Sequence, residues 1–270
     1  MKKATKLCAL VLALCMAVVT LTACGGAPAS TASGTAAGGD SDGEVVVNFA
    51  KDVAPESMDP INAEDGFSME LIGATMSGLY TLDAEDNLVP DLATECTVSE
   101  DGMTYTFKIR EDAKWSNGEP LTAHDFVFAW KRLADPAVAG AYAWMLDEVL
   151  SVKNAAEIAT GELPVDELGV SAPDDYTFEV QLTRPVPYFE HAMVFTPFFP
   201  LNEKFVTEQG DNFALTVDGL LFSGPYKMTE WDVGGTRMVL EKNENYYNAD
   251  SIQTDVINYQ IIADTQQAVM

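Results

Sequence analysis

The sequence has few basic residues, few cysteines and no hydrophobic run of transmembrane length. Its 270 residues include 15 lysines and arginines against 42 acidic residues, a formal charge of −27. A nucleic-acid-binding protein needs a basic surface that displaces counterions, so this function is excluded. Attachment to anionic lipid through a polybasic patch is excluded for the same reason. We interpret the acidity as a solvated exterior. The hydrophobic content of 47% is that of a folding chain rather than a disordered one.

Catalytic and metal-binding motifs are also missing. The two histidines, His124 and His191, lie far apart and lack the spacing of a metal site. His124 falls in the first turn of a predicted helix, where we expect it to be solvated. No G-x-S-x-G elbow, P-loop or G-x-G-x-x-G motif occurs. Residues 83–87 lack the glycine and distal glutamate of a calcium loop, so we predict a turn. The sequence therefore predicts no enzyme, no metal and no cofactor.

The N-terminal residues have the pattern of a secretory signal. Three lysines within the first six residues precede a mostly apolar stretch at 7–21, which is too short to span a bilayer comfortably. The sequence Leu21-Thr22-Ala23-Cys24 resembles the lipobox of bacterial lipoproteins. This resemblance implies that residues 1–23 are a signal peptide and that Cys24 carries fatty acyl chains, such as palmitate. The alternative is an ordinary signal peptide followed by a chance cysteine.

Cleavage after residue 23 changes the charge and the cysteine content of the chain. It removes three lysines and no acids, leaving 12 basic against 42 acidic residues, a formal charge of −30. Anionic lipid would repel such a chain, so the acyl groups would have to hold it at the membrane. Residues 24–43 are rich in Gly, Ala, Ser and Thr and predict a flexible tether. Only Cys96 remains in the folded part, where we expect a small buried side chain.

Hydrophobic periodicity predicts mixed secondary structure from residue 44 onward. A β-branched run at 45–50 predicts a buried strand, and residues 67–79 have helical spacing. Residues 103–110 alternate as a half-exposed strand. Thr122 and Asp125 form a capping box for a helix that ends near residue 135. A further helix is predicted at 141–150, and strands at 165–170, 176–182, 226–231, 238–241 and 256–262. Without regular βαβ alternation, the fold class is α/β, mixed α+β.

One block of sequence is more specific than the rest. Residues 102–110 and 114–126 read GMTYTFKIR and KWSNGEPLTAHDF. Trp115 leads into a tight turn at Asn117-Gly118, where a glycine tolerates positive φ. This ordered string closely resembles the signature of family 5 solute-binding proteins, the oligopeptide-, dipeptide- and nickel-binding lipoproteins of ABC importers. Six further segments occur in the family's order: 57–60, 90–93, 166–170, 185–189, 224–227 and 245–247.

The resemblance implies a periplasmic-binding-protein-like fold, in which two lobes close on a ligand. The first lobe would have two subdomains, the first formed by residues 44–77 and 188–262 and the second by residues 78–187. Residues 263–270 would begin the second lobe, which is otherwise largely missing. Closure requires two rigid bodies, so we expect this chain by itself not to enclose a ligand.

The resemblance also implies where a ligand is bound. Main-chain contacts to an extended peptide would lie at Asp65-Gly66-Phe67, where Gly66 allows close backbone approach and Asp65 faces a ligand cation. The alternative is a loop glycine beside a solvated acid. Tyr259 matches an aromatic residue near the cleft, Tyr142 lines a side-chain pocket and Ser223 faces the hinge. Core packing is the alternative for both tyrosines.

The function implied is capture of extracellular oligopeptides and their delivery to ABC transporter permease subunits. The protein would be lipid-anchored on the extracytoplasmic face of the cell membrane, and we expect a monomer. Alternatives within the family are dipeptides, a nickel chelate or haem as the solute. An extracytoplasmic hydrolase or an adhesin is the alternative from another class.

Overall fold

The computed structural model of the chain describes residues 43–231 and 234–262. The predicted signal peptide, Cys24, almost all of the tether and the predicted start of the second lobe at 263–270 lie outside the described residues. Within the described ranges, no helix is long and apolar enough to cross a membrane.

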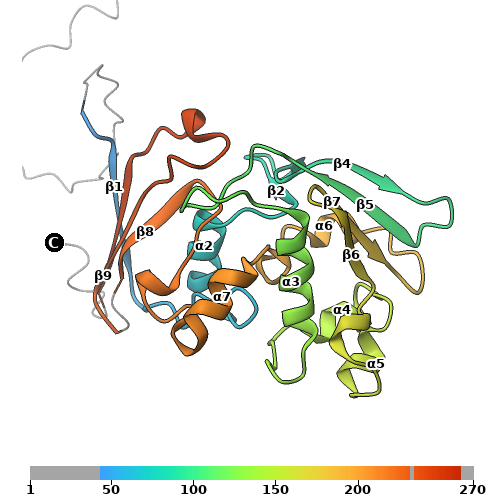
Figure 1. Cartoon of the computed structure of the whole chain (residues 1–270). Helices are drawn as coiled ribbons and strands as arrows, with labels where there is room; N and C mark the ends of the chain where they lie inside the picture. The colour runs from blue at the N-terminus through green and yellow to red at the C-terminus, as the bar shows by residue number, and fades with distance from the viewer. Residues whose placement is uncertain (1–42, 232–233, 263–270) are drawn as a thin grey trace, which may run out of the picture. The chain divides into compact units, whose positions relative to one another are not determined.

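The first four-stranded sheet joins the two ends of the described chain. Its strands lie in the order β1-β10-β9-β8, with β1 parallel to β10 and the other pairs antiparallel (Figure 1). Their bounds are β1, Val46–Lys51; β8, Tyr226–Trp231; β9, Arg237–Lys242; and β10, Val256–Ile261. The prediction that the first strand is buried is wrong, because four of its six residues are exposed. Among the described residues β1 is an edge strand, paired on one side only.

The second four-stranded sheet is antiparallel throughout and lies to the right in Figure 1. Its order is β4-β5-β7-β6, with bounds β4, Ala93–Val98; β5, Thr104–Ile109; β7, Thr177–Gln181; and β6, Val170–Asp174. The predicted alternation of β5 is confirmed, because Tyr105, Phe107 and Ile109 are buried while the residues between them are partly or fully exposed. This face of the sheet packs on α3, Ala123–Ala134.

Helix α3 begins and ends where the sequence predicts. The backbone N–H of Thr122 donates to Asp125 at 2.7 Å, which is half of the capping box. Burial of Asp125 raises the pKa of its carboxyl to about 6, although hydrogen bonds from Thr122 oppose this shift. The helix buries Phe126, Trp130 and Leu133 against the sheet. The preceding turn has Gly118 at φ +86°, the conformation for which glycine was expected.

The other elements are short. They are α2, Gly66–Thr75; β2, Tyr80–Leu82; β3, Leu88–Pro90; α4, Trp144–Glu148; α5, Ala155–Ala159; α6, Phe189–Ala192; α7, Glu203–Gln209; and the 3₁₀ helices η1, Val165–Glu167; η2, Thr196–Phe198; η3, Gly210–Asn212; η4, Val217–Gly219; and η5, Ala249–Ser251. The helix predicted at 141–150 is only five residues long, because residues 140–146 form i→i+3 turns before it. The strand predicted at 165–170 is η1, and β6 begins only at Val170.

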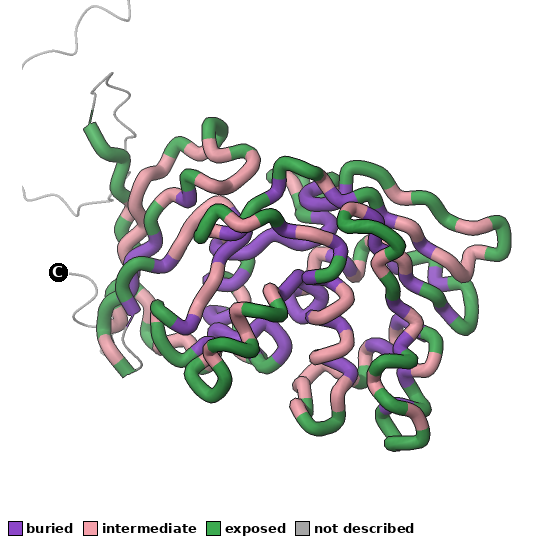
Figure 2. The backbone as a smooth tube through the Cα atoms, in the orientation of Figure 1, coloured by how far each residue is buried: buried purple, intermediate pink, exposed green. Residues whose placement is uncertain are grey.

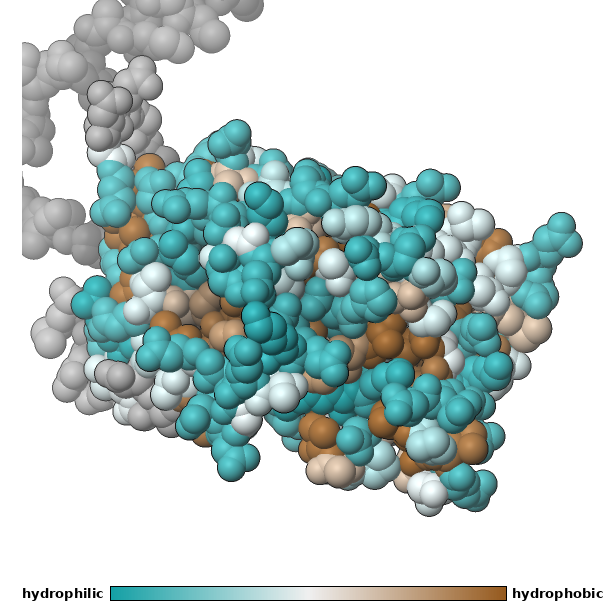
Figure 3. Space-filling model, viewed as in Figure 1, coloured by the Kyte–Doolittle hydropathy of each residue, from teal (hydrophilic) through white to brown (hydrophobic). Residues whose placement is uncertain are grey.

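Aromatic side chains fill the space between the second sheet and its helices. Trp130 lies edge-on to Phe178 with ring centroids 5.5 Å apart, and Phe178 stacks on Phe126 at 5.4 Å. The buried residues form one continuous core that runs through the centre of the described chain (Figure 2). The two sheets draw their strands from the two predicted subdomains, whose boundaries stay a prediction. The face seen in Figure 3 is mostly hydrophilic, as the acidic composition suggests.

A buried ion pair ties the segment before α2 to helix α3. Nη1 and Nη2 of Arg132 donate to the two carboxylate oxygens of Asp59 at 2.9 and 2.8 Å. The two side chains are only 16% and 9% exposed. Such a bidentate pair fixes both position and orientation, so α3 holds the loop that leads into α2.

We expect Arg132→Met to lower the free energy of unfolding by about 3–5 kcal/mol, because it leaves the buried Asp59 carboxylate without its cationic partner. Only neutral donors, Ile61 N–H and Asn62 Nδ2, would still contact it. Urea denaturation measures this loss. The neighbouring variant Lys131→Met is the matched control. It breaks an ion pair with Asp166 whose carboxylate is 83% exposed, and its cost should be about 1 kcal/mol or less. Equal losses from the two variants would contradict the structural role of Asp59.

Candidate functional site

The candidate site begins at Asp65, the N-cap residue of α2. Asp65 has extended backbone angles, and its carboxylate accepts from the backbone N–H of Ser68 at 2.8 Å and of Glu56 at 3.3 Å. Partial burial raises the pKa of Asp65, but the hydrogen bonds from Ser68 and Glu56 outweigh it and hold the pKa below its ordinary value. The carboxylate is therefore engaged in capping the helix.

Gly66 is the first residue of α2 and is exposed. A Cβ atom added there would meet nothing within 4 Å, and φ of Gly66 is not positive. The fold therefore does not require glycine at this position. A bare backbone at an exposed helix start is open to close approach by another chain.

An aromatic cluster lies beside this helix start. The rings of Phe67 and Tyr259 have centroids 5.4 Å apart, and Tyr259 stacks on Phe49 of β1 at the same distance. The Lys51 ammonium lies 4.7 Å from the Phe67 ring centroid and pairs with Glu70. Parallel pairing of β1 with β10 sets Phe49 opposite Tyr259. The structure thus brings together Phe67 and Tyr259, two of the residues named from the sequence.

Charge within the aromatic cluster is balanced locally. The hydroxyl of Tyr259 donates to Glu70 at 3.2 Å. Burial, together with the nearby Glu70 carboxylate, raises the pKa of Tyr259 to about 12. Tyr259 therefore stays a neutral donor at physiological pH, and Glu70 is shared between it and Lys51. Sequence reasoning missed Phe49, Lys51 and Glu70. Glu70 lies three residues after Phe67, and this helical spacing could have indicated that the two are neighbours. Phe49 and Lys51 join the cluster only through the pairing of β1 with β10, which the sequence does not show.

Tyr142 lies on a neighbouring loop. It is half-buried, with its ring edge-on to Phe195 at a centroid distance of 4.8 Å. The backbone N–H of Ala141 donates to Ile61 O at 3.0 Å, which holds this loop against the segment leading to Asp65. Among the described residues, no ring contact or hydrogen bond joins Tyr142 to the aromatic cluster.

Ser223 lies at the other end of α2. Its buried hydroxyl accepts from the backbone N–H of Ser77 at 3.1 Å, and its own N–H donates to Thr75 O at 3.2 Å. The following Gly224 approaches the helix end so closely that a Cβ would lie 2.6 Å from Met76 N. The ten residues of α2 span about 15 Å, so Ser223 and the Asp65-to-Phe67 segment are at opposite ends of one helix.

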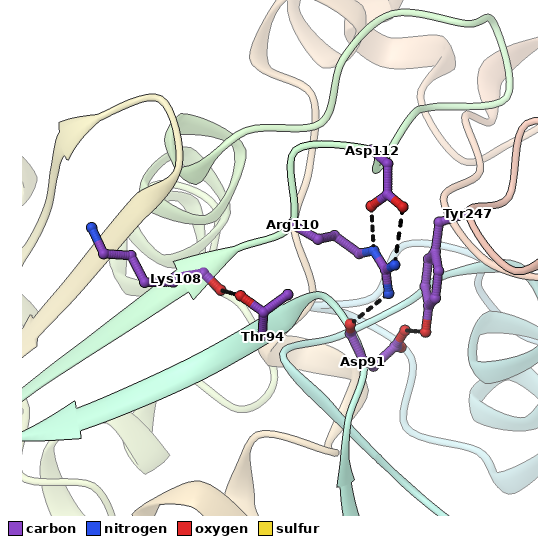
Figure 4. A network of polar contacts seen from close by, with 6 residues as sticks. All are labelled: Asp91, Thr94, Lys108, Arg110, Asp112 and Tyr247. Atoms are coloured by element: carbon purple, nitrogen blue, oxygen red, sulfur yellow. Dashed lines mark hydrogen bonds and ion pairs between the residues drawn. The ribbon is translucent and has the colours of Figure 1, made fainter.

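A polar network joins β5 to the segment after β9 (Figure 4). The Arg110 guanidinium lies 3.1 Å from the Tyr247 ring centroid and donates to both carboxylate oxygens of Asp112, at 2.6 and 3.1 Å. The Tyr247 hydroxyl donates to the Asp91 carboxylate at 2.8 Å. This network, which the sequence did not reveal, connects the two sheets.

The described residues contain no group of three or more His, Cys, Asp or Glu side chains able to hold a metal ion. His124 is exposed, as predicted, and lies 3.3 Å from the exposed Asp175. Cys96 is half-buried rather than buried, because it lies on the edge strand β4. Burial and the nearby Glu190 raise the pKa of its thiol to about 12, so the thiol stays protonated.

Removing the Asp65 side chain tests its role. We expect Asp65→Ala to lower the free energy of unfolding by about 1 kcal/mol, since the first turn of α2 loses its cap. Asp65→Ser should retain most of the stability, because a serine hydroxyl also caps. Chemical denaturation of both variants measures the difference. Equal stability of wild type and Asp65→Ala would show that the carboxylate does not serve as a cap.

Comparison with known proteins gives consistent results. The sequence profile of bacterial extracellular solute-binding proteins, family 5 Middle, matches residues 87–270. The oligopeptide-binding protein OppA of Bacillus subtilis is 35% identical over 243 residues, which is 90% of this chain and 43% of the relative. A dipeptide-binding protein of Lactococcus lactis is 31% identical, covering 81% of this chain and 40% of the relative.

Solved structures show the same similarity. Listeria monocytogenes OppA bound to peptide superposes with a TM-score of 0.81 at 38% identity, covering 84% of this chain and 44% of that one. The chain therefore spans about two-fifths of the length of the curated relatives that it matches.

Proposed function

Because the chain belongs to the family 5 bacterial extracellular solute-binding proteins, we propose that it forms the first lobe of a protein that captures oligopeptides for an ABC importer. The protein would hand its ligand to the permease subunits and act as a monomer. The observation that carries this proposal is the exposed glycine start of α2 beside the aromatic cluster of Phe49, Phe67 and Tyr259.

The geometry of this surface suits an extended main chain. Gly66 presents bare backbone, and the capping residue Asp65 keeps the first turn of α2 in place. Hydrogen bonds to a ligand's main chain give affinity without regard to its side chains. The Phe67 and Tyr259 rings supply an apolar wall next to that backbone. We propose that Tyr142, on the loop held by Ile61, lines the same cleft.

Dipeptides are the second candidate ligand. One relative is a dipeptide-binding protein, at 31% identity. The first lobe contains no described feature that measures peptide length, so length selection would depend on other parts of the protein.

We further propose that the protein is a lipoprotein on the extracytoplasmic face of the membrane. The support comes from the lysine-rich start, the apolar stretch at 7–21 and Cys24 after two small residues. An acidic chain cannot be held at an anionic leaflet by its own charge. Two acyl chains on Cys24 would give stable attachment where one gives only marginal attachment.

We expect Cys24→Ala to release the protein from the membrane fraction, because it removes the site of acylation. Membrane fractionation followed by immunoblotting measures the distribution, and metabolic labelling with palmitate should mark wild type only. Replacement of Cys96 by alanine is the control, since this cysteine lies in the folded part. Retention of the Cys24→Ala variant on membranes would contradict the anchor.

Peptide contact with the first lobe can be measured by NMR spectroscopy, which detects weak binding. We expect trialanine to shift the backbone amide signals of Gly66 and Phe67 in a saturable manner, because its main chain pairs with the exposed backbone. Gly66→Val should weaken this binding by about tenfold, a loss of about 1.4 kcal/mol. The added Cβ itself meets no atom within 4 Å, and urea denaturation of Gly66→Val checks that the variant is folded.

The matched ligand control is trialanine with reduced peptide bonds, CH2–NH in place of CO–NH, which has no peptide carbonyl to accept a hydrogen bond from the N–H groups of the helix start. It should leave both amide signals unchanged. Equal shifts from the two ligands, or undiminished binding by Gly66→Val, would contradict main-chain recognition at this surface.

A further inference from the structure

A cavity of about 360 Å³ lies along α2, beyond the aromatic cluster. Its apolar walls include Met69 of α2, the C-cap residue Met76, Leu82 of β2 and Phe199. The polar groups that line it are gathered around Ser77, Asp91, Thr196 and Tyr246. An apolar cavity of this size with a few convergent polar groups has the character of a ligand pocket.

Gly73 in the wall of this cavity has no role in folding. It lies within α2, where glycine weakens a helix relative to alanine. An added Cβ would meet nothing within 4 Å, and its φ is an ordinary helical one. Gly224, by contrast, is required by close packing. The glycine at 73 therefore leaves space in the cavity that any larger residue would fill.

The polar lining includes a buried carboxylate. Asp91 is only 6% exposed, and its side chain accepts a hydrogen bond from the neutral hydroxyl of Tyr247. The nearby Arg110 directs its guanidinium to Asp112 and to the backbone carbonyl of Asp91. Burial raises the pKa of Asp91, which Tyr247, Ser77 and Arg110 counteract only in part. A cation supplied from outside would complete the pairing.

A second polar group in the lining has no hydrogen-bond partner among the described residues. This group is the hydroxyl of Thr196, a residue that is only 7% exposed. Buried hydroxyls in native proteins nearly always have partners. Thr196 lines the same cavity as Asp91.

The cavity and the candidate peptide surface lie along the same helix. One side of α2 and of its C-terminal end is formed by residues spaced three or four apart, namely Gly66, Glu70, Gly73 and Ser77. The first three are exposed. Seven residues of helix, from Gly66 to the cavity residue Gly73, rise about 10.5 Å. An extended peptide of about four residues that starts at Gly66 covers this distance.

We propose that this cavity receives a basic side chain, lysine or arginine, of the bound peptide. The methylene stem would lie between Met69, Met76 and Phe199, and the cationic end would pair with Asp91. This inference rests on the proposed peptide-binding function. The formal charge of −27 favours the approach of such cationic ligands over acidic ones.

The test uses methionine methyl groups labelled with carbon-13, observed by NMR in this chain. The probe is Nα-acetyl-lysine methylamide, and its matched control is Nα-acetyl-norleucine methylamide, which has the same stem without the ammonium group. We expect the lysine probe to shift Met69 and Met76 saturably and to bind about tenfold more tightly than the control. Met228, buried in the first sheet, should not shift.

Two variants locate the probe. Gly73→Leu fills the cavity and should abolish both methionine shifts, while Asp91→Asn should reduce the lysine probe's affinity to that of the norleucine control. Asp166→Asn removes an equal charge from an exposed site outside the cavity and should change nothing. Equal affinity of the two probes for wild type, or an undiminished response in Gly73→Leu, overturns the proposal without relying on the folding of Asp91→Asn.

Failure of this inference is distinguishable from failure of the proposed function. Trialanine has no side chain that fills the cavity, so its effect on Gly66 and Phe67 reports main-chain binding alone. If trialanine binds and the lysine probe leaves Met69 and Met76 unmoved, peptide binding stands and the basic pocket is wrong. If the lysine probe binds and trialanine does not, the cavity is a cation site outside a peptide surface, and the proposal as stated is overturned.

Discussion

Arg132 and Asp59 meet in a buried, bidentate ion pair that fixes the segment from which the candidate site starts. The pair lies between α3, which packs on the second sheet, and the loop that enters α2 beside the first. Loss of either side chain would leave the other charge buried. The two side chains therefore stay together, even if the pair adds little to the free energy of unfolding. From this fixed loop the chain reaches Asp65, whose carboxylate caps α2. The positions of Gly66 and Phe67 therefore depend on a contact made outside the site itself.

The sequence predicted those elements whose signals are local. The alternation in β5, the capping box at Thr122 and the positive φ at Gly118 each depend on a few neighbouring residues, and all three appear in the structure. The first strand was misjudged for the opposite reason. Its β-branched run is the same for a central strand and for an edge strand, and only its pairing partners distinguish the two. Burial is a property of the sheet, which a run of six residues does not contain.

The candidate site shows the same division. Phe67 and Tyr259 came from resemblance to a family, and their meeting requires α2 to pack against the first sheet, which no local pattern encodes. Lys51 and Glu70 complete the cluster through contacts between a strand and a helix that are separated by a loop. Ser223 was also named from resemblance, yet it holds the far end of α2.

Helix α2 and the segment packed against its C-terminal end contain two kinds of glycine with opposite explanations, and the contrast bears on function. Gly224 is demanded by packing, since its backbone touches the helix end and any side chain would collide with Met76. Gly66 and Gly73 meet no such constraint, and Gly73 weakens the helix that contains it. A residue that destabilises its helix, and that neither packing nor backbone conformation requires, is expected at a binding site. There the residue type is selected for function rather than for folding. The exposed side of α2, from the proposed peptide surface at Gly66 to the cavity at Gly73, contains both glycines of this second kind.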